Sequence, residues 1–252
     1  MSPLLEVRGL SRRFGGLAAV SDVSFGVGRG EIFGVIGPNG AGKTTLFNVI
    51  AGHYRPSDGK VAFEGHDISG HSSDEIARRG IARTFQAVNV FKAHTVAENL
   101  RRAAMARRFH NPLAFVAQRA HPAPVDLDDV AQFIGLTGVL DSVAGGLAYG
   151  LQKLLGIGMA MMVAPKLMLM DEPAAGLNSS EKRTAASLIR RLRDERGVTI
   201  LLVEHDMPLV MGICDRILVV NRGSHVAQGT PDEVKSSAAV VEAYLGEDYE
   251  FA

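Results

Sequence analysis

The segment that most restricts the fold is the glycine-rich loop at residues 37–44, "GPNGAGKT". An apolar run, "IFGVI", precedes it, and Leu46, Val49 and Ile50 then fall on one face of a predicted helix. The loop matches G-x-x-x-x-G-K-[ST] between a strand and a helix, the context that a phosphate-binding loop requires. Lys43 can reach β- and γ-phosphates, and the Thr44 hydroxyl can ligate Mg²⁺. The alternative is a glycine-rich turn without a ligand.

Two further apolar runs, "KLMLMDEP" and "VTILLVEHD", predict strands that are buried on both faces of a parallel sheet. Asp171 and Glu172 end the first strand, and His205 follows the second, at the edge where such sheets bind ligands. Asp171 suits Mg²⁺ binding through a water, and Glu172 suits activation of an attacking water. The alternatives are an acid pair that starts a helix before Pro173, and a structural histidine.

The rest of the chain alternates between strand and helix patterns. Residues 4–35 predict partly antiparallel β structure, and residues 95–160 predict helices. "SSEKRTAASLIRRLRDERG" predicts an amphipathic helix that ends at Gly197. In "GTPDEV", Thr230 and Glu233 predict a capping box with a purely structural role.

Composition excludes several classes of protein. The 252 residues carry no formal net charge, which does not favour duplex DNA or another bulk electrostatic partner. Cys214 is the one cysteine, so no intrachain disulfide can form and a reducing compartment is expected. The N-terminus lacks a secretory pattern, and no run approaches the roughly 20 apolar residues that span a bilayer.

These motifs, in this order, resemble the nucleotide-binding subunits of ATP-binding cassette (ABC) transporters, from Phe14 to "AYLGE" near the end. The resemblance implies an α/β P-loop fold: a parallel-sheet core of the recombinase type, an N-terminal antiparallel β subdomain and a helical subdomain. It divides the single domain 1–252 into 1–86 and 161–252 (core and β subdomain) and 87–160 (helical subdomain).

The resemblance also implies the site residues. An aromatic side chain, Phe14, would stack on adenine, and Gln86 in "RTFQ" would contact Mg²⁺ and the attacking water. Glu172, His205, Lys43 and Gln86 form the expected catalytic set, with Thr44, Gln86 and Asp171 around the metal. ATP would be bound by Phe14 and the loop residues Gly37, Pro38, Asn39, Gly40, Ala41, Gly42, Lys43, Thr44 and Thr45.

"LAYGLQ" stands where the family has its signature loop, usually L-S-G-G-Q, which caps the γ-phosphate bound by the partner subunit. The expected residues are Leu147, Ala148, Tyr149, Gly150, Leu151 and Gln152. Ala148 removes one hydroxyl donor, which costs about 1–3 kcal/mol if nothing compensates. "LAYG", "DEPAAGLN" and "VEHDM" resemble one branch of the family, the ATPases of branched-chain amino acid importers. Ala148 and Tyr149 therefore indicate a subfamily and do not indicate a decayed loop.

The helix after Gly150 departs from the pattern of that branch. Leu151 replaces a polar residue, while Leu154, Gly156 and Met159 replace charged ones. The two glycines in "LLGIGM" weaken a helix by roughly 1 kcal/mol each. One interpretation is variation on a helix packed against its neighbours. The other is a slow or partner-dependent ATPase with a mobile helix, which unchanged turnover and dimerisation in the variant Leu151→Gln with Gly156→Glu would exclude.

One phosphate loop and one signature occur, so the family's composite site needs two subunits: two copies of this chain, or this chain with a related paralogue. The resemblance predicts an Mg²⁺-dependent ATPase that powers an importer through separate permease subunits, located in the cytoplasm on the inner face of the cell membrane. The substrate would be branched-chain or related amino acids, or alternatively urea, amides or other small organic solutes. A soluble ABC ATPase that acts on DNA or ribosomes, and a nucleotide-binding regulator without hydrolysis, are further alternatives. "RRAAMARRF" at 101–109 would contact permease or lipid, or be a solvated helix face.

Overall fold

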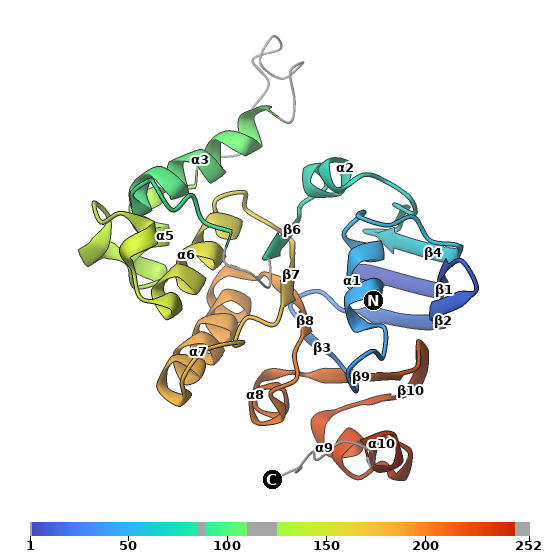
Figure 1. Ribbon diagram of the computed structural model, residues 1–252. Helices are drawn as coiled ribbons and strands as arrows, with labels where there is room; N and C mark the ends of the chain where they lie inside the picture. The colour runs from blue at the N-terminus through green and yellow to red at the C-terminus, as the bar shows by residue number, and fades with distance from the viewer. Residues whose placement is uncertain (1, 85–88, 110–124, 245–252) are drawn as a thin grey trace.

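The computed structural model describes residues 2–84, 89–109 and 125–244, with the side chains of 106–109 left aside. Within these residues the chain forms two β-sheets with helices between and around them (Figure 1). The larger sheet has the strand order β10-β9-β3-β8-β7-β6, and the smaller has the order β2-β1-β4-β5.

The larger sheet is mainly parallel. Its strands are β3 (Ile32–Ile36), β6 (Ile81–Thr84), β7 (Leu167–Asp171), β8 (Thr199–Val203), β9 (Arg216–Asn221) and β10 (Ser224–Gly229), of which β10 alone pairs antiparallel. Every residue of β3, β7 and β8 is buried, as the continuous apolar runs predict. The register pairs Asp171 with Val203, so the two strands end side by side.

The smaller sheet is antiparallel, as predicted for the N-terminal region. It contains β1 (Leu5–Phe14), β2 (Leu17–Val27), β4 (Asp58–Phe63) and β5 (His66–Asp67). Helix α1 (Lys43–Ile50) lies between the two sheets and buries Leu46 and Phe47 there (Figure 1). Leu46 and Phe47 belong to a hydrophobic core cluster between the sheets. The cluster also includes Phe33, Leu169, Leu201 and Leu218, which all project from one face of the larger sheet.

The opposite face of the larger sheet is covered by helices. These are α3 (Val96–Phe109), α5 (Leu127–Phe133), α6 (Tyr149–Met161), α7 (Ser179–Arg196), α8 (Met207–Ile213) and α10 (Ala238–Tyr244), with α9 (Pro231–Lys235) beside β10. Helix α2 (Ser73–Arg78) precedes β6, and short 3₁₀ turns span Thr137–Val139 and Ala144–Gly146. Helices α3, α5 and α6 fall in the region expected to form a helical subdomain, and the division of the chain into subdomains stays a prediction.

The predicted helix ends are confirmed where the sequence carries a cap. Gly197 caps α7 in the left-handed conformation (φ 64°). Thr230 accepts a hydrogen bond from the Glu233 N–H, and the Glu233 side chain completes the capping box.

Helix α6 is continuous through Gly156 and Gly158. A Cβ added to Gly158 would lie 2.4 Å from Ile134 Cδ1, whereas one added to Gly156 would meet nothing within 4 Å. Leu151, Leu154 and Met159 pack against the core cluster on this face of the sheet. The apolar replacements therefore lie on a packed surface, which supports the packed-helix interpretation; the mobility of α6 stays a prediction.

Among the residues that the structure describes, no helix combines the length and apolar character required to cross a bilayer.

Candidate nucleotide-binding and catalytic site

The glycine-rich loop follows β3 and turns tightly into α1. Gly37 (φ 155°) and Gly42 (φ 97°) adopt backbone conformations that L side chains rarely adopt. A Cβ at Gly37 would lie 2.0 Å from Val220 O, and one at Gly42 would lie 2.3 Å from Ala19 O. At Gly40 (φ 76°) a Cβ would meet nothing within 4 Å, so this exposed rim lets another molecule approach the backbone. The loop has the shape that its motif predicts.

Lys43 is buried at the start of α1, with 8% of its surface exposed. Its ammonium donates hydrogen bonds to Gly37 O at 2.6 Å and to Pro38 O at 2.9 Å. These carbonyls hold the cation within the loop, where phosphate oxygens would compete for it. Thr44 is exposed and Thr45 is partly exposed in the first turn.

A turn from the C-terminal part of the chain supports the loop. Gly223, between β9 and β10, donates its N–H to Ala41 O at 2.9 Å, and its carbonyl accepts from the Ser21 N–H at 2.8 Å. A Cβ at Gly223 would lie 2.9 Å from Ala19 O. The turn therefore connects the loop to β2 of the smaller sheet.

Asp171 is 3% exposed at the end of β7 and pairs with Arg83, a cation that no sequence motif indicated. Arg83, at the end of β6, donates to Asp171 Oδ2 at 3.0 Å and to Asn48 Oδ1 of α1 at 2.7 Å. Burial raises the pKa of Asp171 above its ordinary value, and the ion pair with Arg83 offsets part of that rise. The predicted metal carboxylate is thus linked to the phosphate-loop helix through Arg83.

Glu172 has a left-handed backbone (φ 48°), which costs energy in a residue other than glycine. Its N–H donates to Val203 O at 2.8 Å, which fixes it to the end of β8. Its Oε1 lies 3.5 Å from His205 Nδ1, and the His205 side chain is half exposed. The structure therefore brings two predicted catalytic groups together at the carboxyl ends of adjacent strands.

Glu204, which no sequence motif indicated, holds this corner together. It is 1% exposed; its Oε1 accepts from the Ala174 N–H at 2.7 Å, and its Oε2 accepts from the His205 and Asp206 N–H groups at 3.0 and 3.3 Å. One carboxylate thus fastens the segment after Glu172 to the segment that carries His205. A charged residue at the end of an apolar strand was its only signal in the sequence.

The aromatic residue expected to stack on adenine lies at the end of β1. Phe14 is 40% exposed and meets Tyr54 edge to face, with ring centroids 5.3 Å apart. The Arg12 guanidinium lies 4.4 Å from the centroid of the Phe14 ring. Stacking of Phe14 on adenine stays a prediction, and Arg12 and Tyr54 are neighbours that the motif did not reveal.

The signature loop leads into α6, with Ala148 at the N-cap and no side-chain cap there. Ala148 and Tyr149 are exposed and Gly150 is buried, while Gln152 Nε2 donates to Leu147 O at 2.8 Å. Leu155 and Ile157 of α6 belong to the core cluster on one face of the sheet, and Leu46 and Phe47 of α1 belong to the cluster on the other. The signature helix and the phosphate-loop helix of one chain therefore pack on opposite faces of its sheet.

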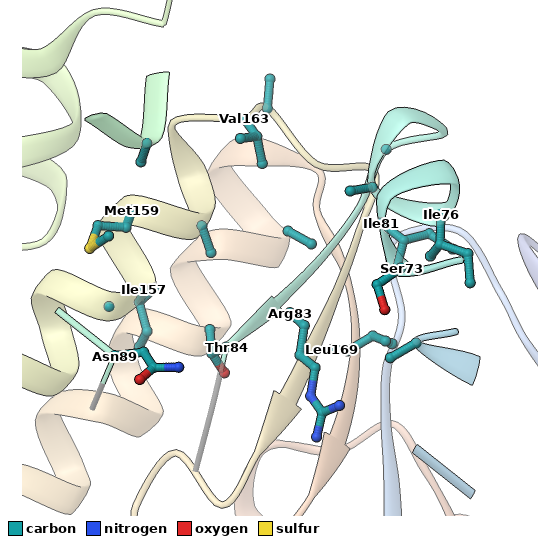
Figure 2. Close-up of a pocket in the computed structure, with 18 of the residues that line it drawn as sticks. Ser73, Ile76, Ile81, Arg83, Thr84, Asn89, Ile157, Met159, Val163 and Leu169 are labelled. Carbon is teal, nitrogen blue, oxygen red and sulfur yellow. The ribbon is translucent and has the colours of Figure 1, made fainter. Parts of the chain in front are cut away.

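Gln86 lies outside the described residues, so its predicted role stays a prediction. Thr84 and Asn89, the described residues that flank it, line a cleft of about 790 Å³ between β6, α2 and α6. Figure 2 shows Ile76 and Ile81 on one side of this cleft and Ile157 and Met159 of α6 on the other.

Within the described part of the chain, no group of three or more His, Cys, Asp or Glu side chains could hold a metal ion by itself. Mg²⁺ commonly takes one or two protein oxygen ligands and completes its shell with water and phosphate. The exposed Thr44 hydroxyl on α1 and the Asp171 carboxylate at the end of β7 fit this pattern, since both are hard oxygen donors.

Comparison with known proteins identifies the family. The model of the family "ABC transporter" matches residues 20–175, and that of "Branched-chain amino acid ATP-binding cassette transporter" matches residues 224–250. The high-affinity branched-chain amino acid transport ATP-binding protein BraF of Pseudomonas aeruginosa is 44% identical over 254 residues, covering 97% of this chain and 98% of the relative. The corresponding protein LivG of Salmonella typhimurium is 45% identical over 252 residues, with the same coverage.

A solved structure gives the same result for the fold. The crystal structure of an ATP-binding cassette of an ABC transporter, in its ADP conformation, matches with a TM-score of 0.85 and 32% identity. The match covers 98% of this chain and 100% of that chain. The predicted α/β P-loop fold is confirmed, and so are the predictions of ATP binding, of an ATPase and of an importer subunit. The chain belongs to the ABC transporter family, in the branch of the ATP-binding proteins of branched-chain amino acid transport.

Proposed function

We propose that two subunits, either two copies of this chain or this chain with a related paralogue, enclose ATP and Mg²⁺ between the phosphate loop of one and the signature loop of the other. Hydrolysis then drives the import of branched-chain amino acids through a separate permease at the inner face of the membrane. The observation that carries the proposal is the packing of α1 and α6 on opposite faces of one sheet. In the proposed dimer, the exposed Ala148 and Tyr149 would face the nucleotide of the other subunit.

The chemistry follows from the residues at the strand ends. Lys43 exchanges its bonds to Gly37 O and Pro38 O for phosphate oxygens, and the loop backbone and helix dipole add positive potential. Glu172 accepts a proton from the attacking water, or orients it, and His205 contacts the γ-phosphate. Thr44 and Asp171 would hold Mg²⁺, which neutralises phosphate charge when it is bound. Most of the acceleration comes from positioning and charge stabilisation.

The cleft lined by Thr84 and Asn89 is proposed as the contact for the permease. Its walls carry apolar side chains from β6, α2 and α6 (Figure 2), and three exposed cationic side chains also line it: Arg78, Arg79 and Lys166. An apolar surface flanked by positive charge favours an amphipathic segment that carries acidic residues. Substrate choice belongs to the permease and its binding protein, so identification of the membrane subunit that co-purifies with this chain tests the amino acid assignment.

The decisive test of the site is Glu172→Gln. A positioned general base contributes about 10²- to 10⁴-fold to the rate of the chemical step. The rate of ATP hydrolysis, measured as ADP formed, should therefore fall by at least about 100-fold while ATP binding persists. The variant should accumulate as an ATP-dependent dimer, measured by light scattering after size-exclusion chromatography. Glu195→Gln, on the exposed face of α7, is the matched control and should behave like the wild type. Unchanged turnover in Glu172→Gln would remove the assigned role, and a strictly monomeric ATP-bound protein would contradict the composite site.

A further inference from the structure

Lys153 is buried beside the catalytic corner. It lies one turn into α6, is 7% exposed, and donates from Nζ to the backbone carbonyl of Glu172 at 3.0 Å. Burial lowers the pKa of Lys153, and the nearby carboxylates Glu204, Glu172 and Asp171 act against that lowering. A buried cation near a helix N-terminus is also disfavoured by the helix dipole. Packing alone therefore does not explain this residue.

The carbonyl that Lys153 contacts belongs to a constrained peptide. Glu172 has φ 48°, its N–H is bonded to Val203 O, and its carbonyl also accepts from the Ala175 N–H at 3.1 Å. The backbone of the proposed base is thus held from β8, from the following turn and from α6. Because its conformation is sparsely populated, it persists only while its surroundings enforce it.

Helix α6 contacts the segment after Glu172 at two further points. A Cβ at Gly176 would lie 3.0 Å from Tyr149 Cε1, and a Cβ at Gly150 would lie 2.6 Å from Glu181 Oε1. The Lys153 ammonium itself lies 5.6 Å from the Tyr149 ring centroid. A displacement of the first turns of α6 would therefore move the segment after Glu172 at these contacts and the Glu172 carbonyl through Lys153.

We propose that Lys153 is a positioning residue that holds the Glu172 backbone in its working conformation and couples the signature helix of a subunit to that subunit's own catalytic carboxylate. Capping of the partner's nucleotide would thereby act on the chain's own hydrolytic site. The inference rests on the proposed role of Glu172 as the group that activates water.

The test compares Lys153→Met with Lys153→Arg in the full-length chain. Methionine keeps much of the buried stem and removes the donor, whereas arginine keeps a charged donor. Since a small misplacement of a catalytic group can cost up to about 10²-fold, kcat per bound ATP should fall roughly 10- to 100-fold in Lys153→Met. KM for ATP should stay within about twofold, and Lys153→Arg should recover most of kcat. Lys235→Met, on exposed α9, is the matched control.

Normalisation to the fraction of protein that binds ATP separates positioning from folding. A merely structural role would lower that fraction and the melting temperature while leaving kcat per bound ATP unchanged, which would overturn the proposal. If Lys153→Met does not fold, Lys153→Gln, whose shorter side chain withdraws the donor from the carbonyl, takes its place under the same criteria. In single-turnover assays, adding Lys153→Met to Glu172→Gln should cause little further loss, because both changes act on one group. Normal turnover in Lys153→Met together with an inactive Glu172→Gln refutes this inference alone, whereas an active Glu172→Gln refutes the proposed function.

Discussion

Replacement of Glu204 by alanine should destabilise the fold strongly, because one buried carboxylate accepts three backbone N–H groups. Hydrogen bonds to charged groups contribute about 1.5–3 kcal/mol each, and a buried donor left unpaired costs about 1–3 kcal/mol. The bonds from Ala174 and His205, at 2.7 and 3.0 Å, should dominate over the 3.3 Å bond from Asp206. Allowing for partial relaxation, we expect a loss of about 3–5 kcal/mol in the free energy of unfolding. At roughly 2–4 °C per kcal/mol in a chain of this size, the midpoint should fall by about 6–20 °C.

Thermal and urea unfolding measure this loss. Glu195→Ala, which removes an exposed glutamate, is the control and should change stability far less than Glu204→Ala. Glu204→Gln keeps one acceptor oxygen and should lose about 1–3 kcal/mol, an intermediate value. A loss below about 1 kcal/mol in Glu204→Ala, equal to the control, would refute the reasoning that this carboxylate fastens the two strand ends.

Two further predictions address α6 and the loop after β8. Gly158→Ala should destabilise the chain by about 1–3 kcal/mol, because its Cβ would lie 2.4 Å from Ile134 Cδ1. Gly156→Ala, whose Cβ would meet nothing within 4 Å, should stabilise the chain by about 0.5–1 kcal/mol. Urea midpoints that move in the same direction for both variants would contradict this. Burial acts against ionisation of Asp206, but the hydrogen bonds from Lys182 and the Leu209 N–H outweigh it, so the pKa is lowered below 3.8. The stabilisation by ionised Asp206 is present above its unfolded pKa and is lost as pH falls through its folded pKa. Thermal unfolding should therefore show that Lys182→Met is less stable than the wild type at about pH 7, and that this difference shrinks below about pH 4. A stability difference that does not depend on pH would exclude the ion pair as its cause.

Much of the site could be predicted because its functional residues lie in short, contiguous sequence patterns. The loop from Gly37 to Thr44 is contiguous, and Asp171, Glu172 and His205 each follow an unbroken apolar run, so parallel pairing brings them to one edge. Arg83, Lys153 and Glu204 could not be predicted in this way. Arg83 pairs with Asp171, which lies 88 positions away in the sequence. Lys153 donates to a backbone carbonyl and Glu204 accepts from backbone N–H groups, and no pattern of side chains in the sequence indicates such partners.

The glycines of α6 show the same limit in another form. Helix propensity counts Gly156 and Gly158 alike, as two positions that weaken a helix. Only the neighbouring chain distinguishes them: at Gly158 the Ile134 and Leu100 side chains occupy the space that a methyl group would need. A methyl group therefore fits at Gly156, whereas at Gly158 it would displace the Ile134 side chain.

The turn at Gly223 has a consequence for biosynthesis. The loop that holds Lys43 lies in the first fifth of the chain. Gly223, which bonds to Ala41 O of this loop and to the Ser21 N–H, is synthesised much later. A nascent chain that still keeps β9 and β10 inside the ribosome exit tunnel lacks these supports. The ability to bind nucleotide should therefore arise late in translation. Truncated chains from a stalled ribosome would then not compete with the finished subunit for ATP.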